Sequence, residues 1–185
     1  NEHDACGVGF VANFKGRKSN RIVAQGLEIL VNLDHRGAVG ADPLMGDGAG
    51  ILIQIPDALI RNWAKQQAVE LPEPGSYAIA MCFLPRDEGA RSFAMKQFEN
   101  YLGKSKQKLL GWREVPVNPD ALGPDAQALQ PRIEQALLRR PASLDDNAAE
   151  ERAFRARRRA ERAADGAAYF ASFSFRTVTY KALCA

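Results

Sequence analysis

The sequence has few residues that could cross-link the chain or anchor it in a membrane. It holds three cysteines, Cys6, Cys82 and Cys184, in 185 residues. An odd number at such wide spacing fits neither a disulfide framework nor a zinc or iron–sulfur motif. No apolar run reaches the ~18 residues of a membrane-spanning helix, and the N-terminus lacks the basic and apolar regions of a signal peptide. We therefore expect a soluble, cytoplasmic protein, because free thiols persist in a reducing compartment.

Charge of one sign is not in excess either. The 25 Lys and Arg residues against 22 Asp and Glu residues give a net charge of +3. This near balance provides no overall basic surface that would indicate a nucleic acid or a membrane as partner. A hydrophobic content of 46% at this length supports one domain with its own core. We find no internal repeat and no linker that would separate two domains.

The first pattern that indicates chemistry is a cysteine in a glycine-rich apolar segment, Cys6-Gly7-Val8-Gly9-Phe10. A cysteine nucleophile needs a base, and none is obvious nearby in the sequence. If residues 1–5 were removed, the α-amine of Cys6 would titrate near neutrality and could take the thiol proton. We predict a strand over residues 7–14, closed by a turn, with Cys6 at its head. The alternatives are a small buried thiol and a dinucleotide-binding loop, the latter disfavoured because the glycines begin the strand instead of following one.

A helix is predicted to follow the cap residues Ser19-Asn20, because apolar residues recur at helical spacing through Leu33. The triplet His35-Arg36-Gly37 falls at its C-terminal end. Gly37 fits a left-handed cap there, and the two basic residues could simply complement the negative end of the helix dipole. The triplet alone therefore leaves a structural and a functional role open.

A shaped loop is predicted next, because four glycines occur between Gly40 and Gly50, together with Asp47. It is not a Walker loop, since no Lys-Ser/Thr pair follows. Glycines at the start of the following strand, over residues 51–55, permit close packing against a neighbouring segment.

The rest of the chain alternates helices and strands. Cys82 lies in an apolar run that predicts a buried strand, where the thiol has a packing role. Five arginines crowd the helix near residue 158, but interspersed glutamates and the absence of an aromatic stacking platform between the arginines favour a solvated face over a nucleic-acid surface. The predicted helices are 56–67, 87–102 and 144–164, the predicted strands are 77–84, 109–117, 168–175 and 177–183, and a connecting loop is predicted over 118–131.

The motifs taken in order resemble the class II (N-terminal nucleophile, Ntn) glutamine amidotransferase domain of the glutamate synthase large subunit. The segment from Cys6 to Phe10, the triplet His35-Arg36-Gly37 and the run Gly46-Asp47-Gly48-Ala49-Gly50 carry the resemblance. Three later segments are similar to glutamate synthase in particular: Gly111-Trp112-Arg113-Glu114-Val115-Pro116, Pro131-Arg132-Ile133-Glu134-Gln135 and Tyr180-Lys181. The resemblance extends over essentially the whole chain. It also favours a strand over residues 132–138, where propensity alone allows a helix.

This resemblance implies an α+β fold, the four-layer α/β/β/α Ntn-hydrolase sandwich, whereas the pattern of elements alone says only mixed α and β. It implies that residues 1–5 are a residual propeptide and that residues 6–185 are the N-terminal part of the amidotransferase domain. Cys6 would be the catalytic nucleophile toward glutamine, and Arg36, Gly37 and Asp47 would border the substrate. No cofactor is expected on this segment, while FMN and an iron–sulfur cluster are implied for the full-length enzyme.

The partners implied by the resemblance are glutamine, the remaining domains of the same subunit, and a small electron-donating subunit or ferredoxin. The family's substrate-clamping arginine and its oxyanion-forming Asn-Gly pair follow the Tyr-Lys-Gly segment, so we expect them beyond Ala185. Ala182 stands where the family commonly has glycine. A non-catalytic scaffold that keeps Cys6 blocked, and an Ntn hydrolase for some other amide, are the alternatives.

Overall fold

The structure, a computed structural model, describes residues 7–33 and 48–182, and these belong to two compact units. Unit 1 comprises residues 1–52, 117–130 and 180–185, and unit 2 comprises residues 53–116 and 131–179. Each unit is assembled from segments that are distant in the sequence. No single linker therefore joins the two units.

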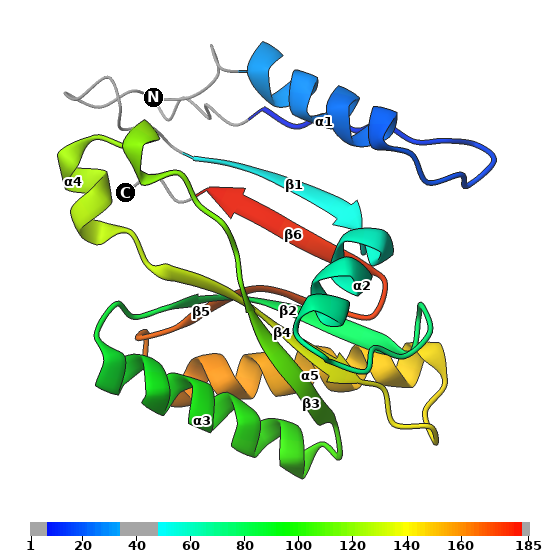
Figure 1. Cartoon of the computed structure of the whole chain (residues 1–185), viewed down its shortest axis with the longest axis vertical. Coiled ribbons are helices and arrows are strands. Elements are labelled where there is room, and N and C mark those ends of the chain that lie inside the picture. Colours follow the sequence, from blue (N-terminus) through cyan, green and yellow to red (C-terminus); the bar gives the residue numbers. More distant parts are fainter. Residues whose placement is uncertain (1–6, 34–47, 183–185) are drawn as a thin grey trace, which may run out of the picture. The chain divides into compact units, whose positions relative to one another are not determined.

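Unit 2 is built on a four-stranded antiparallel sheet with the strand order β3-β4-β2-β5 (Figure 1). The central strand β2 is buried at every position, as its apolar sequence predicts. The ambiguous segment near residue 135 is confirmed as a strand, β4. The bounds are β2 (Tyr77–Leu84), β3 (Lys108–Glu114), β4 (Arg132–Arg139) and β5 (Tyr169–Ser174).

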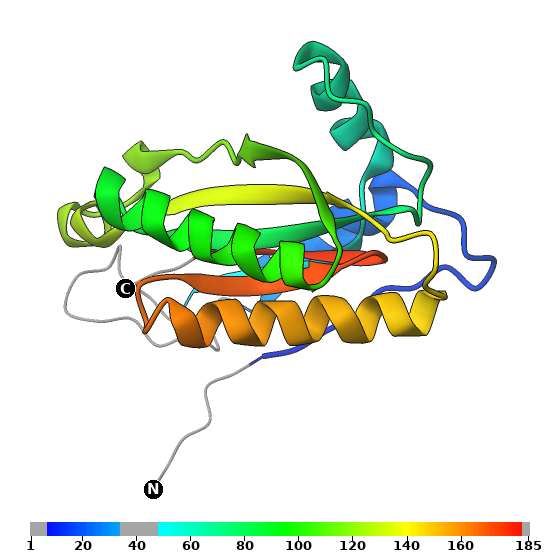
Figure 2. The ribbon, with the colours of Figure 1, turned by 90° about the horizontal axis from the view of Figure 1, so that it is seen from below.

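Helices α3 (Glu88–Lys104) and α5 (Asp146–Ala163) cover one face of this sheet and contact each other, as Figure 2 shows. Asp87 and Asp145 cap them, each accepting a hydrogen bond from a backbone amide of the first turn. Helix α5 turns four buried alanines toward the core, where Phe98 of α3 also lies: Ala149, Ala153, Ala156 and Ala160. Small side chains at helical spacing let the helix approach the sheet closely.

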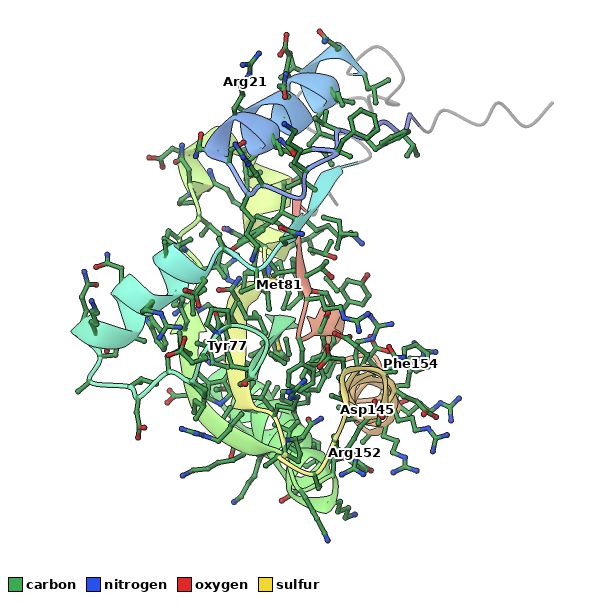
Figure 3. All side chains as sticks on the ribbon, turned by 90° about the vertical axis from the view of Figure 1, so that its right-hand side faces the viewer. Arg21, Tyr77, Met81, Asp145, Arg152 and Phe154 are labelled. Carbon is green, nitrogen blue, oxygen red and sulfur yellow. The ribbon has the colours of Figure 1, made fainter. Side chains whose placement is uncertain are left out.

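The arginine-rich side of α5 is largely solvated, as predicted. Arg155, Arg158, Arg159 and Arg162 are exposed, and Arg157 is half-buried. Figure 3 shows Arg152 and Phe154 projecting from this helix, with Asp145 at its start and with Tyr77 and Met81 on β2. The side chain of Arg152 donates a hydrogen bond of 3.1 Å to the carbonyl of Ser105, at the end of α3.

The opposite face of the sheet is contacted by α2 (Asp57–Gln66), whose Ile60 and Ala64 are buried. Trp112 packs toward α3 and α5, so its neighbour Gly111 faces the other way. A Cβ built on Gly111 would lie 3.6 Å from the ring of Trp63. Unit 2 therefore has apolar contacts on both faces of its sheet.

Unit 1 contains α1 (Asn20–Asn32), the 3₁₀ turn η2 (Pro119–Ala121) and α4 (Pro124–Leu129). A second sheet pairs β1 (Ala49–Gln54) with β6 (Thr177–Ala182), and the division between the units passes through both strands. The loop predicted over 118–131 is wrong in part, because it contains η2 and α4. Pro119 and Pro124 stand at the first turns of these elements, where proline stabilises a helix start instead of breaking it.

The strand predicted over residues 7–14 is also wrong, because the described residues 7–13 form no regular element. The turn after it is confirmed: the amide of Gly16 donates to the carbonyl of Asn13 at 2.9 Å. Val8, Phe10 and Phe14 are at least 90% exposed. A β-prone sequence forms a strand only beside a partner strand, and in the part of the chain described here none pairs with this segment.

The α+β class is confirmed, and the architecture is consistent with the Ntn-hydrolase sandwich that the resemblance implies. Among the described residues, no helix has both the length and the apolar character needed to span a bilayer.

Candidate functional site

The four predicted site residues, Cys6, Arg36, Gly37 and Asp47, lie outside the described residues. What the structure gives is the frame to which they are attached. Gly7 follows Cys6, Leu33 ends α1 shortly before Arg36, and Gly48 follows Asp47. All of these flanking residues belong to unit 1.

Gly7 packs directly against the C-terminal end of α1. A Cβ built on Gly7 would lie 2.9 Å from Cδ2 of Leu33, which is closer than real Cβ contacts come. Gly9 is even tighter, because its Cβ would lie 2.5 Å from Cγ2 of Ile29. Glycine at both positions therefore lets the backbone that follows Cys6 lie against α1, and the requirement is stricter at Gly9 than at Gly7. This contact brings the flank of the predicted nucleophile to the flank of the His35-Arg36-Gly37 triplet.

The glycines that follow Asp47 have two separate structural tasks. Gly48 has a φ of +78°, a left-handed conformation that favours glycine. Gly50 lies so close to β6 that its Cβ would meet the carbonyl oxygen of Tyr180 at 3.2 Å and Cα of Lys181 at 3.7 Å. The close packing predicted for the start of this strand is thereby confirmed, and its neighbour is the Tyr180-Lys181 motif.

Helix α1 completes this frame by packing on β1. A Cβ on Gly26 of the helix would lie 2.9 Å from Cδ1 of Ile51. The described flanks of three sequence motifs and the Tyr180-Lys181 motif thus belong to a single set of contacts within unit 1. The sequence predicted these motifs separately, but the glycine contacts that join them required the structure.

Cys82 is excluded as a second nucleophile by its surroundings. Its side chain is completely buried in the core of unit 2, and the thiol donates to the carbonyl of Ala80 at 3.5 Å. Burial raises the pKa of the Cys82 thiol, so the reactive thiolate is strongly disfavoured. The packing role predicted for this residue is confirmed.

The sequence reasoning missed a polar cluster that ties α2 to the start of β2. The hydroxyl of Tyr77 donates to Asp57 at 2.9 Å, and Arg61 donates to both carboxylate oxygens of Asp57 at 3.0 and 3.2 Å. Burial raises the pKa of Tyr77, and the hydrogen bond to Asp57 raises it further. Arg61 also donates to the carbonyls of Leu71 and Pro72. These hydrogen bonds hold the connection between α2 and β2 in place. The cluster does not pair a nucleophile with a free base, so we assign it a structural role.

A second buried polar pair joins two of the motifs that resemble glutamate synthase. Arg113 and Gln135 are direct partners across β3 and β4, and the guanidinium donates to the amide oxygen of Gln135 at 2.9 Å. Both residues are buried, and Nε of Arg113 has no hydrogen-bond partner in the described part of the chain. No group of three or more His, Cys, Asp or Glu side chains able to hold a metal ion occurs among the described residues.

Comparison with known proteins decides the family. The sequence model described as glutamine amidotransferases class-II matches residues 6–185. The chain belongs to this family. The chain is 42% identical over 186 residues to the glutamate synthase (NADPH) large chain of Bacillus subtilis, and 38% identical over 182 residues to ferredoxin-dependent glutamate synthase 2 of Synechocystis. Each alignment covers 98% of this chain and 12% of the relative.

A further relative of the chain is the glutamate synthase (NADH) of Saccharomyces cerevisiae, which is 42% identical over 142 residues, covering 74% of this chain and 7% of the relative. The chain spans about one eighth of the length of the first two relatives. Its resemblance to the amidotransferase domain of glutamate synthase, predicted from the motifs, is confirmed.

Proposed function

We propose that this chain is the glutaminase part of a glutamate synthase and that Cys6 is its nucleophile. The observation that carries the proposal is the agreement between the family match over residues 6–185 and the contacts of Gly7, Leu33 and Gly50, which join the flanks of the motifs. The relatives named glutamate synthase support the reaction class.

The proposed reaction uses few groups. The Cys6 thiolate attacks the side-chain amide carbon of glutamine, the C–N bond breaks, and the amine leaves as ammonia after taking a proton. Water then hydrolyses the thioester, which releases glutamate and restores the thiol. Arg36, Gly37 and Asp47 are proposed to border the substrate. In the whole enzyme, the ammonia would pass to 2-oxoglutarate on another domain.

The base for Cys6 is proposed to be its own α-amine, which requires removal of residues 1–5. An amide nitrogen cannot accept the thiol proton, so the chain with these residues attached is expected to be inactive as a glutaminase. The family match starts at residue 6 and leaves the five preceding residues outside, which supports this boundary.

The iron–sulfur cluster implied for the full-length enzyme does not fit the described residues of this chain, and we place FMN with it. A cluster needs several cysteine thiolates, and Cys82, the one cysteine in the described part, is a buried thiol in a strand. We propose that both groups belong to other domains of the same polypeptide. The relatives are named for NADPH, ferredoxin and NADH, so a small subunit or ferredoxin as electron donor stays open. We also propose that this protein is cytoplasmic, although a relative such as ferredoxin-dependent glutamate synthase 2 of Arabidopsis thaliana is named chloroplastic.

The test is intact-mass analysis combined with activity measurements on the full-length enzyme. Active enzyme should carry Cys6 at its amino terminus, and Cys6→Ala should abolish glutamine hydrolysis while it spares synthesis from added ammonia. Cys82→Ala is the matched control and should keep glutamine hydrolysis within severalfold of the wild type. Active protein that retains residues 1–5 would overturn the role of the α-amine. Glutaminase activity in the Cys6→Ala variant would overturn the nucleophile itself.

A further inference from the structure

Unit 2 has a pocket of about 520 Å³ that plays no part in the proposed glutaminase reaction. Its volume lies within the range of small-molecule sites. Four of its lining residues are cations, and none of the described residues that line it is acidic. The lining, called the basic pocket below, consists of Pro72, Ser76, Lys106, Lys108, Arg139, Arg140, Pro141 and Ala142.

The register of the sheet forces two of these cations together. Lys108 at the start of β3 is the direct partner of Arg139 at the end of β4. Cross-strand partners point to the same face of a sheet, and like charges in this position destabilise it. Ser76 joins the same site through its carbonyl, which accepts a hydrogen bond of 2.9 Å from the amide of Arg140. The ends of three adjacent strands thus gather positive charge in one concavity.

The described part of the chain neutralises only half of this charge. Arg139 lies 4.0 Å from the carboxylate of Glu70, whose side chain is 94% exposed, and Arg140 pairs with Asp146. Neither carboxylate lines the pocket. Lys106 and Lys108 have no ion-pair partner among the described residues. A weak surface pair such as that of Glu70 leaves most of the attraction of Arg139 for an anion intact.

We propose that the basic pocket binds a small multivalent phosphate anion of the pyrophosphate type. Arginine forks and lysine ammonium groups are the side chains that bind phosphate oxygens, and the two lysines without a described partner match a ligand with at least two negative charges. The described lining of the pocket contains no aromatic ring that could stack on a base. Recognition is therefore directed at the phosphates, whether they come from free pyrophosphate or from a nucleotide.

The test is isothermal titration of the full-length protein with inorganic pyrophosphate. We expect saturable binding of one ligand per chain that weakens as salt is added. The double variant Lys108→Gln/Arg139→Gln should lose at least tenfold in affinity. The control Lys96→Gln/Arg159→Gln removes the same charge from exposed positions outside the pocket and should stay within twofold of the wild type.

Thermal melting distinguishes lost binding from lost folding. Lys108→Gln removes the like charge opposite Arg139, so the melting temperature should be unchanged or rise by about 1 to 3 °C while affinity falls. Parallel titrations with ADP and adenosine identify the source of the phosphate. An affinity for ADP equal to that for pyrophosphate indicates the free anion as ligand, and a higher affinity for ADP indicates a nucleotide. Both results support the proposal. Absence of pyrophosphate binding, equal loss in the control variant, or binding of a glutamate-rich peptide alone would overturn it.

Discussion

Gly7 lies against Leu33 so closely that a single methyl group would lie 2.9 Å from Cδ2 of the leucine. This contact joins the segment after Cys6 to the end of α1. Its neighbour Gly9 is held in the same way by Ile29. The two glycines make the frame of the proposed site sensitive to the smallest substitutions.

Gly9→Ala should destabilise the protein by about 1 to 3 kcal/mol, because its Cβ would lie 2.5 Å from the stiff β-branched side chain of Ile29. Gly7→Ala should cost less, because a leucine methyl can rotate away. Urea unfolding measures both. Gly103→Ala is the control: nothing lies within 4 Å of its Cβ in α3, and alanine should stabilise that helix by about 0.5 to 1 kcal/mol. Equal effects at the three glycines would contradict the packing described.

The buried pair Arg113 and Gln135 should show strong coupling in a double-mutant cycle. Gln135→Leu deprives a buried guanidinium of the acceptor at 2.9 Å and should cost about 1 to 3 kcal/mol. Arg113→Met/Gln135→Leu should be more stable than the sum of the two single changes predicts, because neither charge nor acceptor is then left buried. If the change in unfolding free energy of the double variant equals the sum of the two single changes, the two side chains do not interact energetically.

Stability should fall at alkaline pH because of Cys82. Burial raises the pKa of this thiol, so the folded chain keeps the proton when the unfolded chain, with a pKa of about 8.5, has lost it. Stability is therefore full below about pH 8 and declines above it, by up to about 1.4 kcal/mol per pH unit. Urea unfolding of Cys82→Ala between pH 8.5 and 10 should show a flatter decline. If the free energy of unfolding falls equally steeply with pH in the variant and the wild type, Cys82 does not contribute to the loss of stability.

Arg36 remains a prediction of the sequence, and kinetics can test it. If it borders the substrate, Arg36→Ala in the full-length enzyme should weaken glutamine use by tenfold or more and leave ammonia-dependent synthesis largely intact. Arg17→Ala, at an exposed residue, should change neither reaction. Equal loss of both activities in Arg36→Ala would instead indicate misfolding.

The sequence predicted best where one pattern dominates. Eight consecutive apolar residues predicted β2 with its bounds, and the helices predicted over 87–102 and 144–164 agree with α3 and α5 within two residues at each end. It failed where the outcome depends on distant partners. The apolar segment after Cys6 found no strand to pair with among the described residues, and Pro124 begins a helix within the segment predicted as a loop.

The candidate site likewise has a part that the sequence predicted and a part that required the structure. The motifs around Cys6 and Asp47 were visible in the sequence because closely spaced glycines mark both segments. The contacts of Gly7 with Leu33 and of Gly50 with Tyr180 were not predictable, because nothing local specifies which distant segment a glycine approaches. The basic pocket was missed for a related reason, since its cations come from separate segments that only the register brings together.

The central position of β2 has a consequence during protein synthesis. This apolar strand pairs on one side with β4 and on the other with β5, and both are translated long after it. At ribosomal rates of about 5 to 20 residues per second, a nascent chain carries β2 with two open edges for several seconds. An uncharged strand in that state is a template for aggregation. We therefore expect the newly made chain to depend on chaperones until β5 has left the ribosome.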